Sequence, residues 1–222
     1  MSSRIAQTPA PFAVLIVLVA GCEGTPRAKY QPTDKTAVAG QTTEWTFDQD
    51  VAGKPPAGSE VFSGTWEVRG EPDAPSRPNV LCQMATADFP AVRLGDKVYA
   101  DLVATVRFKP VSGKDDQAAG IIFRVQDKDN YYILRANALE DNVILFRYGS
   151  GTRSTLKEGS MKVPSREWQE LRLEVEGNRF RGFLNDHLVV EASDDAYAAG
   201  GIGLWTKADS VTLFDDLRVT AK

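Results

Sequence analysis

Alternation of apolar and polar residues with a period of two runs through most of this chain, and it limits the possible folds more than any other feature. Within residues 99–108, one side of an extended chain carries the apolar side chains of Leu102, Ala104, Val106 and Phe108. The pattern recurs in short runs at residues 121–125, 131–137, 142–148, 170–176, 179–184, 188–192, 201–206 and 211–219. A period of two is typical of β-strands that bury one face in a core.

The segments between these runs are rich in the residues that favour turns. Asn185 and Asp186, for example, separate two apolar alternations and predict a tight hairpin. No long helical period is found beyond the N-terminal segment. We therefore expect one all-β domain, built as an antiparallel sandwich or barrel.

The N-terminal segment has the features of an export signal. An unbroken apolar run at 12–20 follows Arg4 and is too short to span a bilayer as a helix. It leads into Val19-Ala20-Gly21-Cys22, which resembles the bacterial lipobox. That resemblance implies cleavage after Gly21 and a lipid on Cys22, and hence a lipid-anchored protein of the bacterial cell envelope, either periplasmic or surface-exposed. An ordinary secretory peptide and an uncleaved anchor are the alternatives.

The composition of the remaining residues distinguishes a tether from a folded domain. Residues 22–42 have almost no apolar content after the cysteine, so we expect a flexible tether there and the folded domain at 43–222.

If Cys22 carries lipid, Cys82 has no disulfide partner, and we interpret it as a buried thiol without a chemical role. The formal net charge of −4 argues against a nucleic-acid partner, which would need a basic face.

Several segments, in this order, resemble the 3-keto-disaccharide hydrolase domain family of the concanavalin A-like lectin/glucanase superfamily. They are QAAGIIFR at 117–124, NYY at 130–132, RANALEDN at 135–142, GLWTKADS at 203–210 and FDDL at 214–217. The resemblance covers roughly residues 43–220. It implies a curved two-sheet jelly-roll sandwich whose concave sheet forms a sugar-sized groove, in an exported protein linked to glycan breakdown.

The catalytic motif of the better-known glucanases in this superfamily is missing. Those enzymes carry Glu-x-Asp-x-x-Glu on one strand, and no such motif occurs here. Ordinary retaining hydrolysis needs two carboxylates about 5–5.5 Å apart. Catalytic residues therefore cannot be transferred from those enzymes.

Strand parity selects a set of candidate sugar-binding residues. Arg124, Tyr131, Arg135 and Asn137 have the parity of the face that points away from the core, and Trp205 and Lys207 share parity on a later strand. An apolar ring can stack on a sugar, while planar amide and guanidinium groups bind hydroxyls or carboxylates. The alternative interpretation is that these side chains make ordinary cross-strand pairs on an exposed face.

Acidic residues supply two further hypotheses. Glu140 and Asp141, in a turn that could border the groove, are candidates for a catalytic general base, although the position favours a simple turn pair. Asp215 and Asp216 lie near the end of the chain, and we expect that end to pair with an N-terminal strand near Asp48. The resemblance to the superfamily implies a structural calcium ion at these three aspartates, because hard oxygen ligands suit Ca²⁺.

Three functions follow from these observations. The first is a cell-envelope glycan-active protein, a glycoside hydrolase of the 3-keto-disaccharide hydrolase type that acts on a di- or oligosaccharide. The second is a lectin-like lipoprotein that binds carbohydrate without cleaving it. The third is a scaffold for another envelope protein, since one fold hosts many functions.

Overall fold

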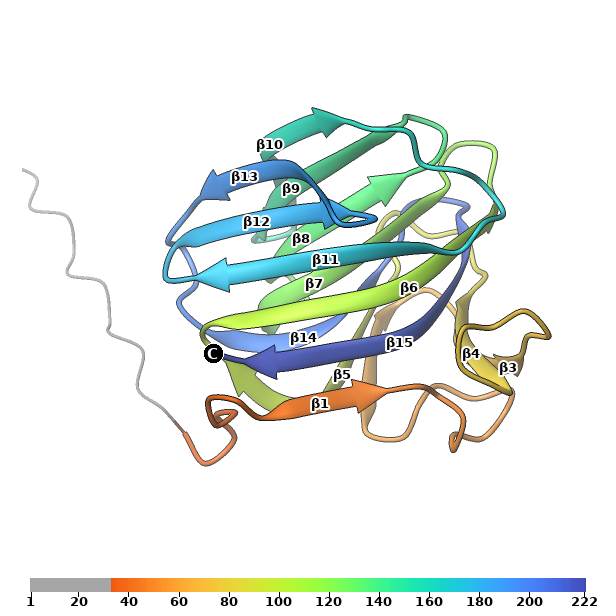
Figure 1. The fold of residues 1–222 in the computed structure, drawn as a ribbon, viewed down its shortest axis with the longest axis horizontal. Coiled ribbons are helices and arrows are strands. Elements are labelled where there is room, and N and C mark those ends of the chain that lie inside the picture. The colour runs from red at the N-terminus through yellow and green to blue at the C-terminus, as the bar shows by residue number, and fades with distance from the viewer. Residues whose placement is uncertain (1–32) are drawn as a thin grey trace, which may run out of the picture.

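The computed structural model describes residues 33–222, so the predicted signal segment and Cys22 lie outside the described residues. The described chain folds into two antiparallel sheets packed face to face (Figure 1). The eight-stranded sheet has the order β13 (His187–Ser193), β12 (Arg179–Leu184), β11 (Gln169–Glu176), β6 (Leu102–Ser112), β15 (Val211–Ala221), β4 (Asn79–Gln83) and β3 (Trp66–Gly70), with β1 (Thr42–Trp45) paired to β15. The seven-stranded sheet has the order β10 (Thr152–Ser160), β9 (Asn142–Gly149), β8 (Asn130–Asn137), β7 (Ala118–Asp127), β14 (Gly200–Trp205), β5 (Ala91–Tyr99) and β2 (Ser59–Ser63).

The predicted all-β fold is confirmed, and the core lies where the alternation places it. Leu102, Ala104, Val106 and Phe108 of β6 are fully buried in the core between the sheets, to which β8 contributes residues 132, 134 and 136. Burial of each large side chain contributes roughly 1.5–3 kcal/mol, which makes this core the main source of stability. Among residues 33–222 there is no helix long and apolar enough to cross a membrane.

The hairpin predicted at Asn185-Asp186 is also present, and it joins β12 to β13. The φ angles of the two residues are 47° and 65°. Positive φ at both central positions is the backbone of the two-residue type I′ turn, whose twist matches that of the flanking strands.

The N-terminal strand pairs with the C-terminal strand, as expected for a jelly roll. Thr42 of β1 lies opposite Thr220 of β15. The ordered domain begins earlier than predicted, because the amide of Ala37 donates to the carbonyl oxygen of Val98 at 2.9 Å and the amide of Val98 donates to that of Lys35. Residues 35–37, which we assigned to the flexible tether, therefore lie against β5.

The two sheets also approach one another along one edge of the sandwich. β10 of the seven-stranded sheet lies beside β13 of the eight-stranded sheet. A Cβ atom on Gly159 of β10 would lie only 2.5 Å from the carbonyl oxygen of Val189 in β13. A residue without a side chain is therefore needed at this position.

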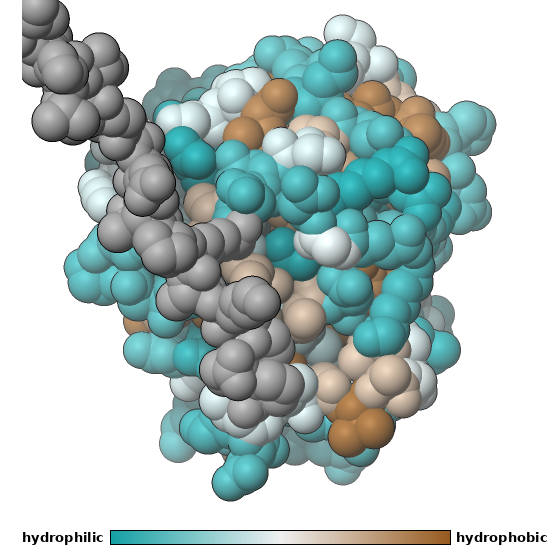
Figure 2. All heavy atoms as spheres, turned by 90° about the vertical axis from the view of Figure 1, so that its left-hand side faces the viewer, coloured by the Kyte–Doolittle hydropathy of each residue, from teal (hydrophilic) through white to brown (hydrophobic). Residues whose placement is uncertain are grey.

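The surface of the sandwich is predominantly polar. Figure 2 shows one side on which hydrophilic side chains surround scattered hydrophobic ones. Large hydrophobic residues of the described chain that are exposed, such as Val38, Val51 and Leu188, come from separate segments. Scattered exposure of this kind is ordinary for a globular domain. Cys82 of β4 is a fully buried free thiol, as predicted.

Candidate functional site

The outer face of the seven-stranded sheet carries most of the predicted sugar-binding residues. Tyr131, Arg135 and Asn137 project from β8 on the side opposite the main core, because successive side chains of a strand alternate between its faces. Trp205, at the end of β14, belongs to the same surface, which also carries a second apolar cluster around Ile122, Ile133, Ile144 and Phe146. The parity argument is therefore correct for these two strands.

Arg124 does not lie on this face, so its predicted place in the groove is wrong. The φ angle of Arg124 is 49°, and the pairing of β7 with β8 shifts register between Phe123 and Asp127. This bulge reverses the alternation of the strand, so that Val125, expected in the main core, packs in the outer cluster. The Arg124 guanidinium donates instead to the carbonyl oxygens of Ala100, Tyr197 and Gly177. It holds together connections at one end of the sandwich.

Trp205 is not an exposed stacking platform. Its side chain is fully buried, since the ring of Phe89 stacks on it with 5.8 Å between centroids. The guanidinium of Arg153, from β10, lies 5.8 Å from the Trp205 ring centroid and 5.0 Å from that of Phe89. A residue of the edge strand β10 and a residue of the connection that leads into β5 therefore meet above Trp205, which becomes part of the support for the surface.

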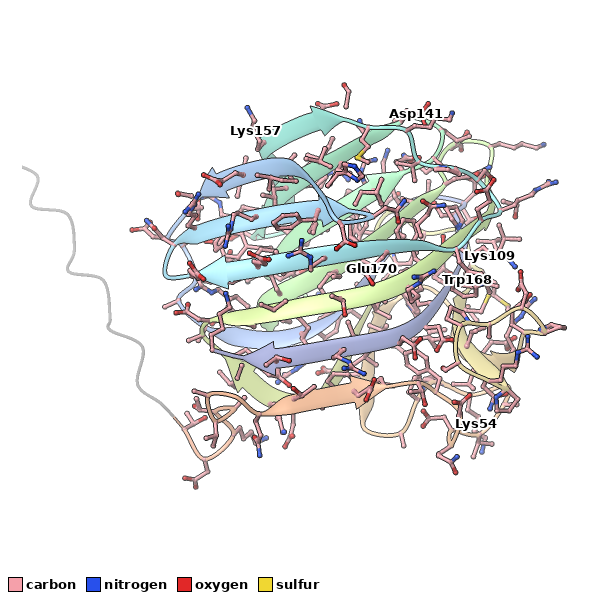
Figure 3. All side chains as sticks on the ribbon, in the orientation of Figure 1. Lys54, Lys109, Asp141, Lys157, Trp168 and Glu170 are labelled. Carbon is pink, nitrogen blue, oxygen red and sulfur yellow. The ribbon has the colours of Figure 1, made fainter. Side chains whose placement is uncertain are left out.

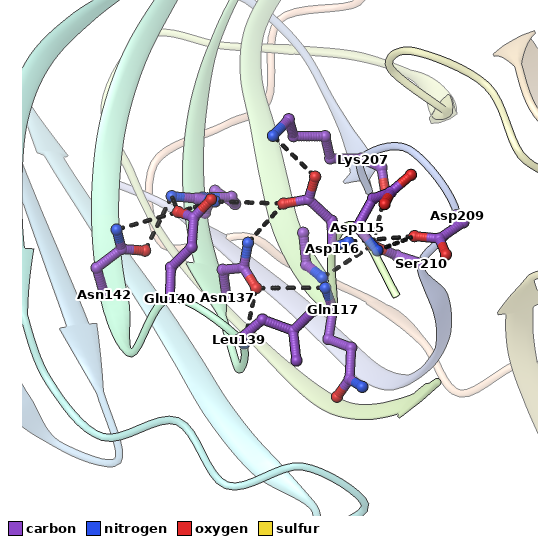
Figure 4. A network of polar contacts seen from close by, with 12 residues as sticks. Asp115, Asp116, Gln117, Asn137, Leu139, Glu140, Asn142, Lys207, Asp209 and Ser210 are labelled. Carbon is purple, nitrogen blue, oxygen red and sulfur yellow. Dashed lines mark hydrogen bonds and ion pairs between the residues drawn. The ribbon is translucent and has the colours of Figure 1, made fainter. Parts of the chain in front are cut away.

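A polar cluster lies beside these aromatic rings, at the end of β8 that carries Asn137 (Figure 4). Its centre is Asp116, a residue in the connection between β6 and β7 that is 2% exposed. Asp116 accepts a hydrogen bond from the Asn137 amide at 2.6 Å and forms an ion pair with Lys207 at 2.8 Å. The Arg135 guanidinium lies 4.0 Å from the same carboxylate. One buried carboxylate thus fixes three of the residues selected from the sequence or lies next to them.

The second half of the polar cluster is built around Glu140. Its Oε2 atom accepts hydrogen bonds from both terminal nitrogens of Arg135 at 2.9 Å and from Asn142 at 3.1 Å. Asn142 in turn accepts from Arg135 and donates to Glu158 of β10. The side chain of Glu140 remains 41% exposed and that of Lys207 27% exposed, so both are available to a ligand.

The charges of the cluster keep Glu140 ionised. Partial burial favours the neutral acid, but the hydrogen bonds and the positive charge of Arg135 outweigh it, so the pKa of Glu140 lies below its ordinary value. Burial lowers the pKa of the Arg153 guanidinium, and the nearby charge of Arg135 acts in the same direction. The site therefore presents an ionised carboxylate and several cations at neutral pH.

Asp209 and Ser210 position the connection that carries Asp116. The Asp209 carboxylate accepts hydrogen bonds from the backbone amides of Lys114, Asp115 and Asp116. These contacts lower the pKa of Asp209, although desolvation opposes them. Neither Asp116 nor Asp209 is predicted as a site residue from the sequence, because residues 112–116 look like an ordinary solvated turn.

Asp141 does not join the cluster, so we do not assign it a role as a general base there. Its carboxylate accepts from Lys162 at 2.9 Å and from the backbone amide of Val163 at 3.1 Å. It fastens the turn after β8 to the segment that follows β10, at the periphery marked in Figure 3.

Two of the three predicted calcium ligands, Asp48 and Asp215, have other partners. Asp215 is fully buried and accepts hydrogen bonds from the Ser76 amide and hydroxyl, both at 2.8 Å, and from the Asp216 amide. Asp48 accepts from the backbone of Asn79. Within residues 33–222, no group of three or more His, Cys, Asp or Glu side chains is placed to hold a metal ion. This donor set does not fit the predicted ion.

The fold and this surface together define a concanavalin A-like jelly-roll sandwich, an architecture shared by carbohydrate-binding modules and glycoside hydrolases. Residues 57–220 match the family described as 3-keto-alpha-glucoside-1,2-lyase-like domain, and the chain belongs to that family. The resemblance noted from the sequence is therefore confirmed.

Individual proteins similar to this chain are also known. Levanase of Bacillus subtilis (strain 168) is 30% identical over 109 residues, which cover 47% of this chain and only 16% of the levanase. The carbohydrate-binding module CBM66 of Bacillus subtilis has the same fold, with a TM-score of 0.64 and 20% identity over 78% of this chain and 99% of the module. The GH43 protein BlXynB of Bacillus licheniformis gives a TM-score of 0.54 and 16% identity over 89% of this chain and 41% of BlXynB.

Proposed function

We propose that the chain binds a saccharide at the polar cluster on the outer face of the seven-stranded sheet. The observation that carries this proposal is the cross-linked arrangement of Asp116, Arg135 and Asn137 beneath the partly exposed Glu140 and Lys207. Planar donors and acceptors held rigidly suit the hydroxyl groups of a sugar, and preorganisation reduces the entropic cost of binding. Family membership and the presence of a carbohydrate-binding module among proteins of the same fold support this proposal.

Glu140 does not suit the role of the acid in ordinary glycoside hydrolysis. A glycosidase needs one carboxylic acid that stays protonated to assist the leaving group, and this requires a raised pKa. The pKa of Glu140 is lowered instead. Cleavage is the second candidate, and the family description favours it. An ionised Glu140 would serve as a general base that removes the C2 proton beside the keto group of a 3-keto-glucoside. The C1–C2 double bond then forms as the glycosidic C1–O bond breaks, and the leaving oxygen takes up a proton from solvent.

The experiment compares the full chain with two variants from a single turn on a glycan array, followed by calorimetry with the sugars that bind. Glu140→Gln keeps the shape of the side chain but removes its charge, and we expect at least a tenfold loss of affinity. Asp141→Asn is the matched control and should bind as the wild type does, because Asp141 bonds Lys162 outside the cluster. Silence across the array, or an equal loss in both variants, would contradict the proposal.

Cleavage is distinguished by its products. The wild type is incubated with each bound sugar and with its 3-keto derivative, and the mixtures are separated by chromatography. New saccharide fragments that the wild type produces and Glu140→Gln does not would show that the protein cleaves the sugar. Unchanged substrates would leave binding as the function.

We further propose that the protein is held at the bacterial cell envelope by a lipid on Cys22, as the lipobox-like segment indicates. A cysteine variant tests this directly. Wild-type protein should incorporate an alkyne-labelled fatty acid and sediment with membranes, whereas Cys22→Ser should do neither. Labelling of the variant, or an unlabelled wild type, would refute the anchor.

A further inference from the structure

A second pocket opens on the same sheet face, at the opposite end of β8 from the polar cluster. It has a volume of about 260 Å³. Its walls combine aromatic rings with charged groups at the rim, contributed by Phe62, Phe89, Tyr131, Tyr148, Asp88, Lys128 and Asp129. We call it the aromatic pocket. Rings that meet the C–H face of a sugar, together with a few polar groups for its hydroxyls, are typical of saccharide subsites.

A continuous row of side chains connects the aromatic pocket to the polar cluster. The Tyr131 and Tyr148 rings lie 4.9 Å apart, and Phe89 meets Tyr148 edge-on at 5.6 Å. Arg153 lies 4.4 Å from the Phe146 ring, which in turn lies 5.6 Å from the Arg135 guanidinium. Tyr131, Phe146 and Arg135 are buried, whereas Phe89, Tyr148 and Arg153 are partly exposed, so a ligand that follows the row would contact the latter three.

Arg153 occupies the middle of the row and has unused hydrogen-bonding capacity. Its Nη1 atom is buried and has no hydrogen-bond partner in the described chain, and the residue forms no ion pair within residues 33–222. A buried donor without an acceptor is unfavourable, because it has lost its hydrogen bond to water and gained no other. A hydroxyl or carboxylate oxygen from a ligand on the row would supply the missing acceptor.

We propose that the aromatic pocket is a second saccharide subsite and that the natural ligand is an oligosaccharide that spans both ends of the row. This inference rests on the proposed function of the polar cluster. Tyr131 at the pocket and Arg135 in the cluster are four residues apart on β8, which corresponds to about 13 Å along a strand. A single sugar ring cannot cover that distance, and a chain of three or more units can.

Calorimetry with oligosaccharides of increasing length tests whether one ligand reaches both the polar cluster and the aromatic pocket. The probes are malto-, cello-, xylo- and levan-type fructo-oligosaccharides of one to six units, titrated into the full chain. For the series that binds, affinity should rise at least tenfold between the disaccharide and the tetrasaccharide and then level off. Phe62→Ala should remove this gain and leave the affinity for the disaccharide unchanged, because Phe62 lines only the aromatic pocket.

A neighbouring residue provides the control for that variant. Val61, next to Phe62 in β2, is 40% exposed and does not line the pocket. Val61→Ala should therefore keep the full gain with length, and thermal unfolding of both variants checks that they fold. Affinity that stays flat beyond the disaccharide, or a gain that survives Phe62→Ala, would overturn the second subsite and leave the proposed function intact. Absence of binding in every series would overturn both.

Discussion

Asp116 is the residue on which the polar cluster depends. It is buried, and its two oxygens contact Asn137, Lys207 and the guanidinium of Arg135. Removal of one member of a buried ionic network leaves the other charges without compensation. Asp116→Asn should therefore lower the stability of the whole domain, because these residues come from β8, from the β6–β7 connection and from the β14–β15 connection.

We therefore predict that Asp116→Asn lowers the free energy of unfolding by about 2 kcal/mol, somewhat less than for a fully buried pair because Lys207 is partly exposed. Urea denaturation at neutral pH measures this difference. Asp115→Asn changes the adjacent exposed carboxylate and should shift stability very little. Equal effects of the two substitutions would contradict the role assigned to Asp116.

The burial of Asp215 should make the folding stability of the domain depend on pH. Burial raises its pKa from 3.8 to about 6, despite the hydrogen bonds that it accepts from Ser76 and Asp216. An acid whose pKa rises on folding binds its proton more tightly in the folded state, so folding stability falls as pH increases from about 4 to about 6.

Comparison with Asp215→Asn isolates this effect, because the variant cannot titrate there. Between pH 4 and pH 7 the wild type should lose roughly 2–3 kcal/mol of unfolding free energy relative to the variant, an upper bound obtained from the size of the pKa shift. Chemical denaturation across that range provides the measurement. Parallel pH profiles of the two proteins would show that Asp215 ionises normally in the folded state.

The strands differ in how clearly the sequence predicts them. β6, β8, β11 and β12 were predicted within a few residues, because side chains of the main core alternate along each of them with side chains of the other face. β10 was missed, since an edge strand that is largely exposed has no apolar face to alternate. The bulge at Arg124 was missed as well, because a non-glycine residue with positive φ leaves no local signal.

The residues of the polar cluster were also predicted only in part. Parity identified Arg135, Asn137 and Lys207, and turn position identified Glu140. Asp116 could not be found, because its place depends on Asp209, whose carboxylate holds the amide of a residue 93 positions earlier in the chain. A contact of that kind is set by the packing of the two sheets and has no signature in either local segment.

The close approach of β10 and β13 leads to a prediction for these edge strands. Gly159→Val would place side-chain atoms against the backbone of Val189, so we expect a loss of about 1–3 kcal/mol from overpacking. Thermal or urea unfolding measures it. Ser160→Val adds a similar side chain at the exposed neighbouring position and should be tolerated. A neutral Gly159 variant would mean that the two edges separate easily.

At the scale of the whole molecule, Cys82 reports on the segment that covers the eight-stranded sheet on the side opposite the main core. Its thiol packs there with Ala74 of the β3–β4 connection and with Leu213, and burial raises its pKa to about 11. A raised pKa and burial both suppress reaction of a thiol. Because exposure of Cys82 requires only this cover to move, a thiol reagent should modify it faster than the domain unfolds, measured by mass spectrometry against circular dichroism. Labelling at the rate of global unfolding would show that the cover opens only together with the two sheets.

The pairing of β1 with β15 determines where a support can be attached. The amide of Gly40 donates to the carbonyl oxygen of Ala221, and that of Ala221 donates to Gln41, so the entry and exit of the described chain meet at one corner of the eight-stranded layer (Figure 1). The polar cluster and the aromatic pocket belong to the other layer. Immobilisation of the domain on a sensor chip through either end should therefore leave the sugar-facing surface turned towards the solution, where large polysaccharides can reach it.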